Sequence, residues 1–216
     1  MDSQPNFDRI AHLYRWSEYL ALGRLLEQVR FHLLPRLQDR TNALVLGDGD
    51  GRFLARLMTQ NPALHATAID ISAKMLDLLR ARCLRTSPAA GARLHTLRTS
   101  ALEADAPPQT DLIATHFLLD CLTQQQVDEL TQRLAAQVQP GCLWVVSDFE
   151  VPQSPVLGFF GALYVRTLYL AFRMLTGLRV THLPDPQQAL AAAGFARIER
   201  QERLGGLLYT ELWVRL

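Results

Sequence analysis

A glycine-rich loop is the clearest candidate for ligand binding. Residues 47–51 read Gly47-Asp48-Gly49-Asp50-Gly51, between an apolar run at 42–46 that predicts a buried strand and a predicted helix at 52–59. Glycines at such a turn let the chain bend tightly and let a ligand approach the main chain. Two carboxylates in the loop would repel a diphosphate and attract a cation. The loop therefore predicts a site for a cationic ligand.

The position of Arg52 argues against a dinucleotide. The pattern GxGxxG, which seats a diphosphate on a helix N-terminus, would need glycine there. This disfavours an NAD-dependent oxidoreductase. S-adenosylmethionine (SAM) carries an ammonium and a sulfonium group and suits the acidic loop better. Asp70 follows the second predicted strand, 64–69, and a carboxylate there can accept hydrogen bonds from two ribose hydroxyls.

Strands and helices alternate along the rest of the chain, which predicts right-handed crossovers and a parallel sheet. Further strands are predicted at 94–98, 111–116 and 142–149, and helices at 7–38, 72–84 (with Ser72 as N-cap) and 123–138. The end of the chain differs. A short helix at 186–193 precedes two strands, 196–203 and 207–215, around Gly205-Gly206, and this pattern predicts a hairpin.

Composition narrows the class of protein. The 216 residues suit one domain, and the net charge of +1 offers no general attraction for nucleic acid. Three scattered cysteines, Cys83, Cys121 and Cys142, form no metal-binding or disulfide pattern, so we expect no metal site. The N-terminus is polar and then amphipathic, unlike a secretory signal. These features favour a cytoplasmic protein.

Two segments carry a family resemblance. LVLGDGDGRFL at 44–54 and AIDISAKML at 68–76 resemble motif I and the following acidic motif of class I SAM-dependent methyltransferases. The resemblance is strongest over 40–150. It implies a Rossmann-like α/β fold with helices on both faces of a seven-stranded sheet, mostly parallel with an antiparallel C-terminal hairpin. It also implies that the glycine loop wraps the methionine part of SAM, that Asp70 and Ile71 meet the ribose, and that S-adenosylhomocysteine is released.

Two positions depart from the family pattern. The family often has an acid two residues before the first glycine, where this chain has Val45, and another after strand three, where it has Ser100. We expect Asp48 or Asp50 to supply the first charge. The hydroxyl of Ser100, or the backbone near Ala101, can contact the adenine. The alternative is a methyltransferase-like fold with a degenerate pocket.

Acceptor-binding residues are expected where strands four and five end, because ligands of open α/β sheets bind at the carboxyl ends of strands. His116 and Asp120 lie at the first end and Asp148 at the second. His116 can take a proton from the acceptor, and Asp120 can orient it or act alone. In the other interpretation His116 contacts SAM through its backbone while its ring packs. Asp148 is expected to cap the strand or line the pocket.

The segment 151–184 interrupts the alternation and is rich in large apolar residues. Arg166 and Arg173 lie seven residues apart, which places both on one helix face and argues against a lipid-buried span. We expect a helical lid that follows strand five and selects an apolar or aromatic acceptor. A core helix, a dimer interface and contact with a membrane surface remain alternatives. The residues expected to line the acceptor are Phe159, Phe160 and Tyr164.

The N-terminal stretch FDRIAHLYRWSEYL is similar to the start of the quinone-biosynthesis branch of these methyltransferases. That resemblance implies that Tyr14 lies over the SAM pocket; otherwise it anchors a helix onto the sheet. The chain is thus predicted to be one methyltransferase domain. Its parts are an N-terminal helical cap (1–40), a SAM-binding core (41–150), the lid (151–184), and a C-terminal helix and hairpin (185–216).

Two functional hypotheses follow. The first is SAM-dependent methyl transfer to a small, apolar or aromatic acceptor, with no nucleic acid as partner and a homodimer left open. The second is a non-catalytic protein of the same fold that binds a partner or a membrane surface through its apolar helical segment.

Overall fold

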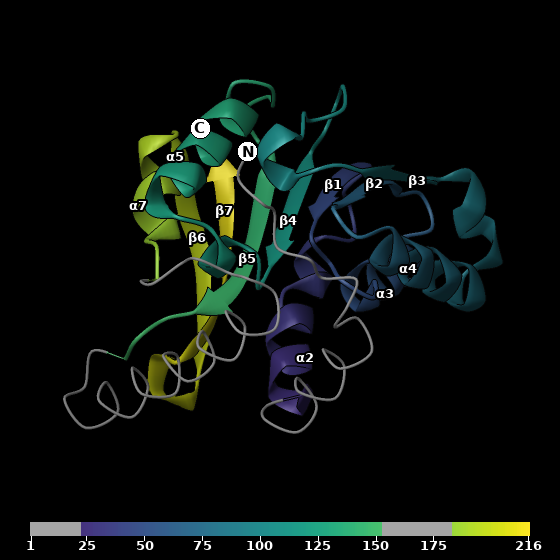
Figure 1. The fold of residues 1–216 in the computed structure, drawn as a ribbon, viewed down its shortest axis with the longest axis horizontal. Helices are drawn as coiled ribbons and strands as arrows, with labels where there is room; N and C mark the ends of the chain where they lie inside the picture. The colour runs from purple at the N-terminus through teal and green to yellow at the C-terminus, as the bar shows by residue number, and fades with distance from the viewer. Residues whose placement is uncertain (1–22, 153–182) are drawn as a thin grey trace.

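A seven-stranded sheet organises the molecule (Figure 1). The computed structural model describes residues 23–152 and 183–216. The strand order is β3-β2-β1-β4-β5-β7-β6; β1 to β5 run parallel, and β7 is antiparallel to both of its neighbours. The strands are β1 (Asn42–Leu46), β2 (His65–Asp70), β3 (Leu94–Arg98), β4 (Leu112–His116), β5 (Leu143–Phe149), β6 (Phe195–Arg203) and β7 (Leu208–Arg215). The predicted fold class is confirmed.

Helix α4 begins at the predicted cap, Ser72, and α5 begins with a cap of its own. Ser72 Oγ accepts a hydrogen bond from the backbone N of Met75, and α5 opens with a capping box between Thr123 and Gln126. The described helices are α2 (Gly23–Phe31), α3 (Arg52–Gln60), α4 (Ala73–Thr86), α5 (Gln124–Ala135) and α7 (Pro186–Ala192).

The predicted helix over 7–38 needs correction. Its part before residue 23 lies outside the described residues, and α2 ends at Phe31 rather than continuing to 38. A separate 3₁₀ turn, Leu34–Arg36, follows and contains Pro35. Proline has no N–H to donate and clashes with the preceding turn, so a continuous helix cannot pass through this position.

The two faces of the sheet hold two clusters of buried side chains. Val45 and Ala68 face α3 and α4, where Phe53 and Leu57 are fully buried. Strand alternation turns Leu44 and the indole of Trp144 to the other face, which α5 and α7 cover. The carboxyl ends of the parallel strands all meet the same edge of this sheet.

One region of the second face is covered by none of the helices that the structure describes. The connection from β3 to β4 forms only a short 3₁₀ turn, η4 (Ala101–Glu103), before β4 begins. As a result His65 and His95 are exposed on β2 and β3, and Leu97 is 45% exposed. Within the described ranges no helix combines the length and apolar character needed to cross a bilayer.

Candidate functional site

The glycine loop joins β1 to α3 in left-handed backbone conformations. The φ angles are +64° at Gly47, +56° at Gly49 and +78° at Gly51. A Cβ added at Gly51 would lie 2.7 Å from Leu79 Cα, so this glycine allows α4 to approach closely. A Cβ added at Gly49 would have no neighbour within 4 Å among the described residues. The middle of the loop is therefore open to a ligand, whereas its end is packed.

Asp48 points into the protein rather than out of the loop. Its side chain is buried, and Oδ2 accepts a hydrogen bond of 2.9 Å from the backbone N of Leu54 in α3. Its Oδ1 has no hydrogen-bond partner within the described part of the chain. Burial raises the pKa of Asp48 to about 7, although Arg30 of α2 opposes that rise.

Asp50 is held by two arginines. Its carboxylate pairs with Arg82 Nη2 at 2.6 Å and with Arg52 Nε at 3.1 Å, and Arg82 Nε also donates to the Asp50 carbonyl at 2.9 Å. Arg52 in turn pairs with Glu27 of α2 at 2.7 Å. These contacts tie the loop to three helices. The loop thus offers a ligand less free negative charge than its sequence indicates, because one carboxylate is buried and the other is compensated.

The residues expected to meet the ribose and adenine lie at the carboxyl ends of β2 and β3. Asp70 is half-buried, and its Oδ1 accepts from the backbone N of Ser72 at 2.8 Å. This contact fixes the carboxylate across the turn into α4. Ile71 follows directly, and its carbonyl accepts from Arg98 Nε at 3.2 Å.

Ser100 and Ala101 stand where β3 leads into η4. Ser100 Oγ accepts from the backbone N of Leu102 at 3.2 Å and caps this turn. The Ala101 carbonyl accepts from Arg133 of α5 at 3.0 Å. Since β1, β2 and β3 are neighbours in the sheet, the glycine loop, Asp70 and Ser100 share one edge.

His116 ends β4, and its imidazole is buried. Burial, and then the charge of Arg30, lower its pKa well below the usual value. Nδ1 lies 2.9 Å from Ser147 Oγ, which is itself 2.9 Å from Thr210 Oγ1. The other nitrogen, Nε2, has no hydrogen-bond partner among the described residues. The centroid of the imidazole ring lies 4.2 Å from the centroid of the Phe53 ring.

The prediction that Asp120 orients His116 therefore needs correction, because Ser147 holds Nδ1. Ser147 and Thr210 are not among the residues predicted for the site. Their signal is a hydroxyl side chain at a strand position that lies on the same face as the apolar Val145 and Leu212. The strand register places the three side chains in one row, His116 opposite Ser147 and Ser147 opposite Thr210.

Asp120 and Asp148 form a pair of buried carboxyl groups. Asp148 Oδ2 accepts from the backbone N of Asp120 at 3.1 Å, and Oδ1 accepts from the backbone N of Phe149 at 3.0 Å. Burial raises the pKa of Asp120 to about 6, and burial together with the neighbouring Asp120 carboxylate raises the pKa of Asp148 well above its usual value. Two such groups hold a proton between them more readily than either would alone.

The acid pair and the imidazole lie on different faces of the sheet. Successive residues of a strand point to opposite sides, so Asp148 faces away from the row that contains Ser147. Asp148 shares its face with Trp144, beside α5 and α7. The expected acceptor residues Tyr14, Phe159, Phe160 and Tyr164 lie outside the described residues. No group of three or more metal-ligating side chains occurs within the ranges that the structure describes.

Comparisons with known proteins agree with this fold. Residues 44–144 match the model of a family described as a methyltransferase domain. No curated protein sequence matches the chain. Among solved structures, the mitomycin 7-O-methyltransferase MmcR is 18% identical, with a TM-score of 0.67 over 98% of this chain and 61% of that one. The SAM-dependent methyltransferase SibL is 18% identical, with a TM-score of 0.68 over 100% of this chain and 63% of that one.

A third solved structure contains S-adenosylhomocysteine. The N-methyltransferase NodS from Bradyrhizobium japonicum WM9, in complex with S-adenosylhomocysteine, is 16% identical, with a TM-score of 0.59 over 88% of this chain and 87% of that one. The chain spans about three fifths of the length of MmcR and SibL. The fold and the matched domain confirm the resemblance to class I SAM-dependent methyltransferases.

Proposed function

We propose that the protein transfers a methyl group from SAM to a small acceptor and releases S-adenosylhomocysteine. The observation that carries the proposal is the open middle of the glycine loop, at Gly49, beside the half-buried Asp70 on the neighbouring strand. The residues fit the cofactor: main-chain groups of the loop are accessible for the methionine part, and the Asp70 carboxylate is fixed for the ribose. Ser100 is the residue we assign to the adenine side.

The chain's own residues would mainly align the acceptor and handle its proton. SAM supplies an electrophilic methyl carbon, so holding the acceptor in line with it lowers the barrier by several kcal/mol. If the acceptor must lose a proton, the Asp120–Asp148 pair is the better candidate to receive it, because the pKa of Asp120 is about 6. His116 is assigned a supporting role at the cofactor edge, since its ring is buried and held by Ser147.

We further propose a small apolar or aromatic molecule as the acceptor, in the cytoplasm and without nucleic acid as partner. The composition of segment 151–184 and the near-zero net charge support this choice. The fold does not choose between oxygen and nitrogen, because an O-methyltransferase and an N-methyltransferase both resemble it. The acceptor's class therefore rests on the sequence.

Calorimetric titration with SAM, S-adenosylhomocysteine and NAD tests the proposal. We expect micromolar binding of the first two and none of NAD. Asp70→Ala should weaken binding at least tenfold, whereas Asp77→Ala, at an exposed position of α4, should not change it. Circular dichroism confirms that each variant is folded.

The outcomes separate the hypotheses. Unchanged affinity in folded Asp70→Ala would remove Asp70 from the site and leave the cofactor assignment intact. If the wild-type protein binds neither SAM nor its product, the methyltransferase proposal fails. The non-catalytic interaction protein then becomes the leading hypothesis.

A further inference from the structure

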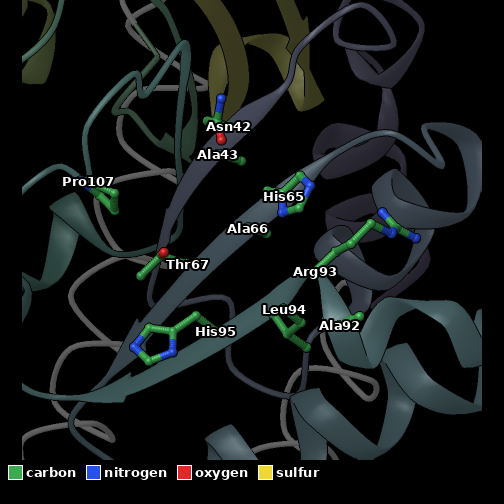
Figure 2. Close-up of a pocket in the computed structure, with 10 residues that line it drawn as sticks. All are labelled: Asn42, Ala43, His65, Ala66, Thr67, Ala92, Arg93, Leu94, His95 and Pro107. Carbon is green, nitrogen blue, oxygen red and sulfur yellow. The ribbon is translucent and has the colours of Figure 1, made fainter.

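A cavity of about 310 Å³ lies at the amino-terminal ends of β1, β2 and β3 (Figure 2). The side chains that give it chemical character are those of Asn42, His65, Thr67, Arg93, His95 and Pro107. Cofactors of this fold class bind at the carboxyl ends of the strands, beyond the glycine loop and Asp70. The cavity is at the other end of the same strands and is separate from the proposed methyl-transfer site.

The cavity exists because the β3–β4 connection carries no helix over this part of the sheet. His65 and Thr67 are two residues apart on β2 and point to the same face. His95 stands opposite Thr67 in the parallel register of β2 and β3, so its ring shares that face. Figure 2 shows these three side chains on neighbouring strands, with Pro107 on the nearby loop. Both histidines are exposed and accessible to a ligand.

The lining is rich in hydrogen-bond donors and contains no carboxylate. Arg93 Nη1 donates to the Leu64 carbonyl at 2.6 Å, which fixes the guanidinium and leaves further N–H groups for a ligand. Each imidazole has at least one N–H whatever its protonation state, and Thr67 adds a hydroxyl.

The acid that is bonded to Asn42 already has other partners. Asp111 accepts hydrogen bonds from the backbone N and the hydroxyl of Thr41 and from the backbone N of Asn42, at 2.7–2.9 Å. Its charge is therefore partly satisfied by the chain. A metal ion is a poorer match for the cavity, because no third histidine, cysteine or carboxylate joins the two histidines within the described ranges.

We propose that this cavity binds an oxyanion, the phosphate or carboxylate group of a small molecule. Arg93 supplies the fixed positive charge, and His65 and His95 donate hydrogen bonds from neighbouring strands. A volume of about 310 Å³ is enough for a small metabolite and is at the lower end of known ligand pockets.

Titration followed by NMR of the histidine Cε1–H groups tests the proposal. Sodium phosphate, sodium acetate and sodium chloride are compared at equal pH and ionic strength. We expect the resonances of His65 and His95 to shift and saturate with at least one oxyanion but not with chloride. His32, an exposed histidine beside α2, should not shift in this way. Saturation by phosphate alone or by both oxyanions identifies which group the cavity accepts.

Variants make the test specific. Arg93→Gln should weaken the saturating binding at least tenfold, and His95→Gln should weaken it severalfold. Arg85→Gln, an exposed arginine in the last turn of α4, is the matched control and should leave binding unchanged. Shifts that follow the chloride series, or equal binding in folded Arg93→Gln and His95→Gln, would overturn the proposal. Neither result depends on whether SAM binds.

Discussion

Asp48→Asn should remove the part of the pH dependence of stability that Asp48 contributes between about pH 4 and about pH 7. Burial raises the pKa of Asp48 from 3.8 to about 7 in the native protein. The native state then binds this proton more tightly than the unfolded chain does. The contribution of Asp48 to stability is therefore largest below pH 3.8, the pKa of this group in the unfolded chain. It falls as pH rises from about 4 to about 7, because the folded protein must release a proton that it binds more tightly than the unfolded chain does. Above about pH 7 the contribution no longer changes.

The magnitude follows from the size of the shift. At about 1.4 kcal/mol for each pKa unit, the whole shift corresponds to about 4 kcal/mol, of which about 3 kcal/mol falls between pH 4.5 and pH 8.5. Asparagine cannot ionise, but its carbonyl can still accept from the backbone N of Leu54. Its NH₂ group takes the place of Asp48 Oδ1, which has no hydrogen-bond partner among the described residues. Like the protonated carboxyl group, this amide is uncharged. The advantage of Asp48→Asn over wild type should therefore grow with pH.

Urea unfolding followed by circular dichroism, at constant ionic strength from pH 4.5 to pH 8.5, measures this difference. We expect the free energy of unfolding of Asp48→Asn, relative to wild type, to rise by about 3 kcal/mol across the range. Asp77→Asn, at an exposed site on α4, should follow the wild-type curve. Parallel curves for wild type and Asp48→Asn would refute the inference that a buried, proton-binding carboxyl sits under the glycine loop.

Two further predictions concern the same edge of the sheet. Gly51→Ala should destabilise the protein by more than about 2 kcal/mol, because the left-handed φ is strained for alanine and the new Cβ would clash with Leu79. Gly49→Ala has only the strained φ and should destabilise the protein by about 1–2 kcal/mol. It should nevertheless abolish binding of S-adenosylhomocysteine. Urea unfolding measures the stability of the two variants, and calorimetry measures their binding of S-adenosylhomocysteine. Equal losses of stability and of binding in the two variants would contradict the prediction. Ser147→Ala should cost about 1–3 kcal/mol, because it leaves His116 Nδ1 buried without its partner. Unchanged imidazole ¹⁵N shifts in that variant would show that Ser147 does not hold the ring.

Most elements of the fold could be predicted because their signals are local. The apolar runs at β1 and β5 and the caps at Ser72 and Thr123 are properties of a few neighbouring residues. The turn at the glycine loop could be predicted in the same way, because a chain that passes through left-handed conformations favours glycine there. Apolar spacing alone predicts a helix that continues to 38, whereas Pro35 lies in a separate 3₁₀ turn after α2 ends at Phe31.

The partners of the charged groups could not be predicted in the same way. Asp50 meets Arg82, thirty-two residues further along, and His116 meets Ser147, thirty-one residues further along. Only the packing of α4 on the loop and the pairing of β4 with β5 bring these groups together. The sequence therefore predicts that the candidate residues lie at the carboxyl ends of the strands, but it does not predict their protonation or their partners.

The sequence by itself determined the order of strands and helices, the turn at the glycine loop and the position of Asp70 after β2, since each depends on residue types at short range. The tertiary structure decided that Asp48 is buried and that Asp50 forms ion pairs with two arginines. It also brought Asp120 and Asp148 together in a buried site. It also decided that His65 and His95, near the amino ends of β2 and β3, are exposed beside a β3–β4 connection without an α-helix. These features depend on desolvation and on contacts between distant segments, and both arise only when the sheet and its helices pack together.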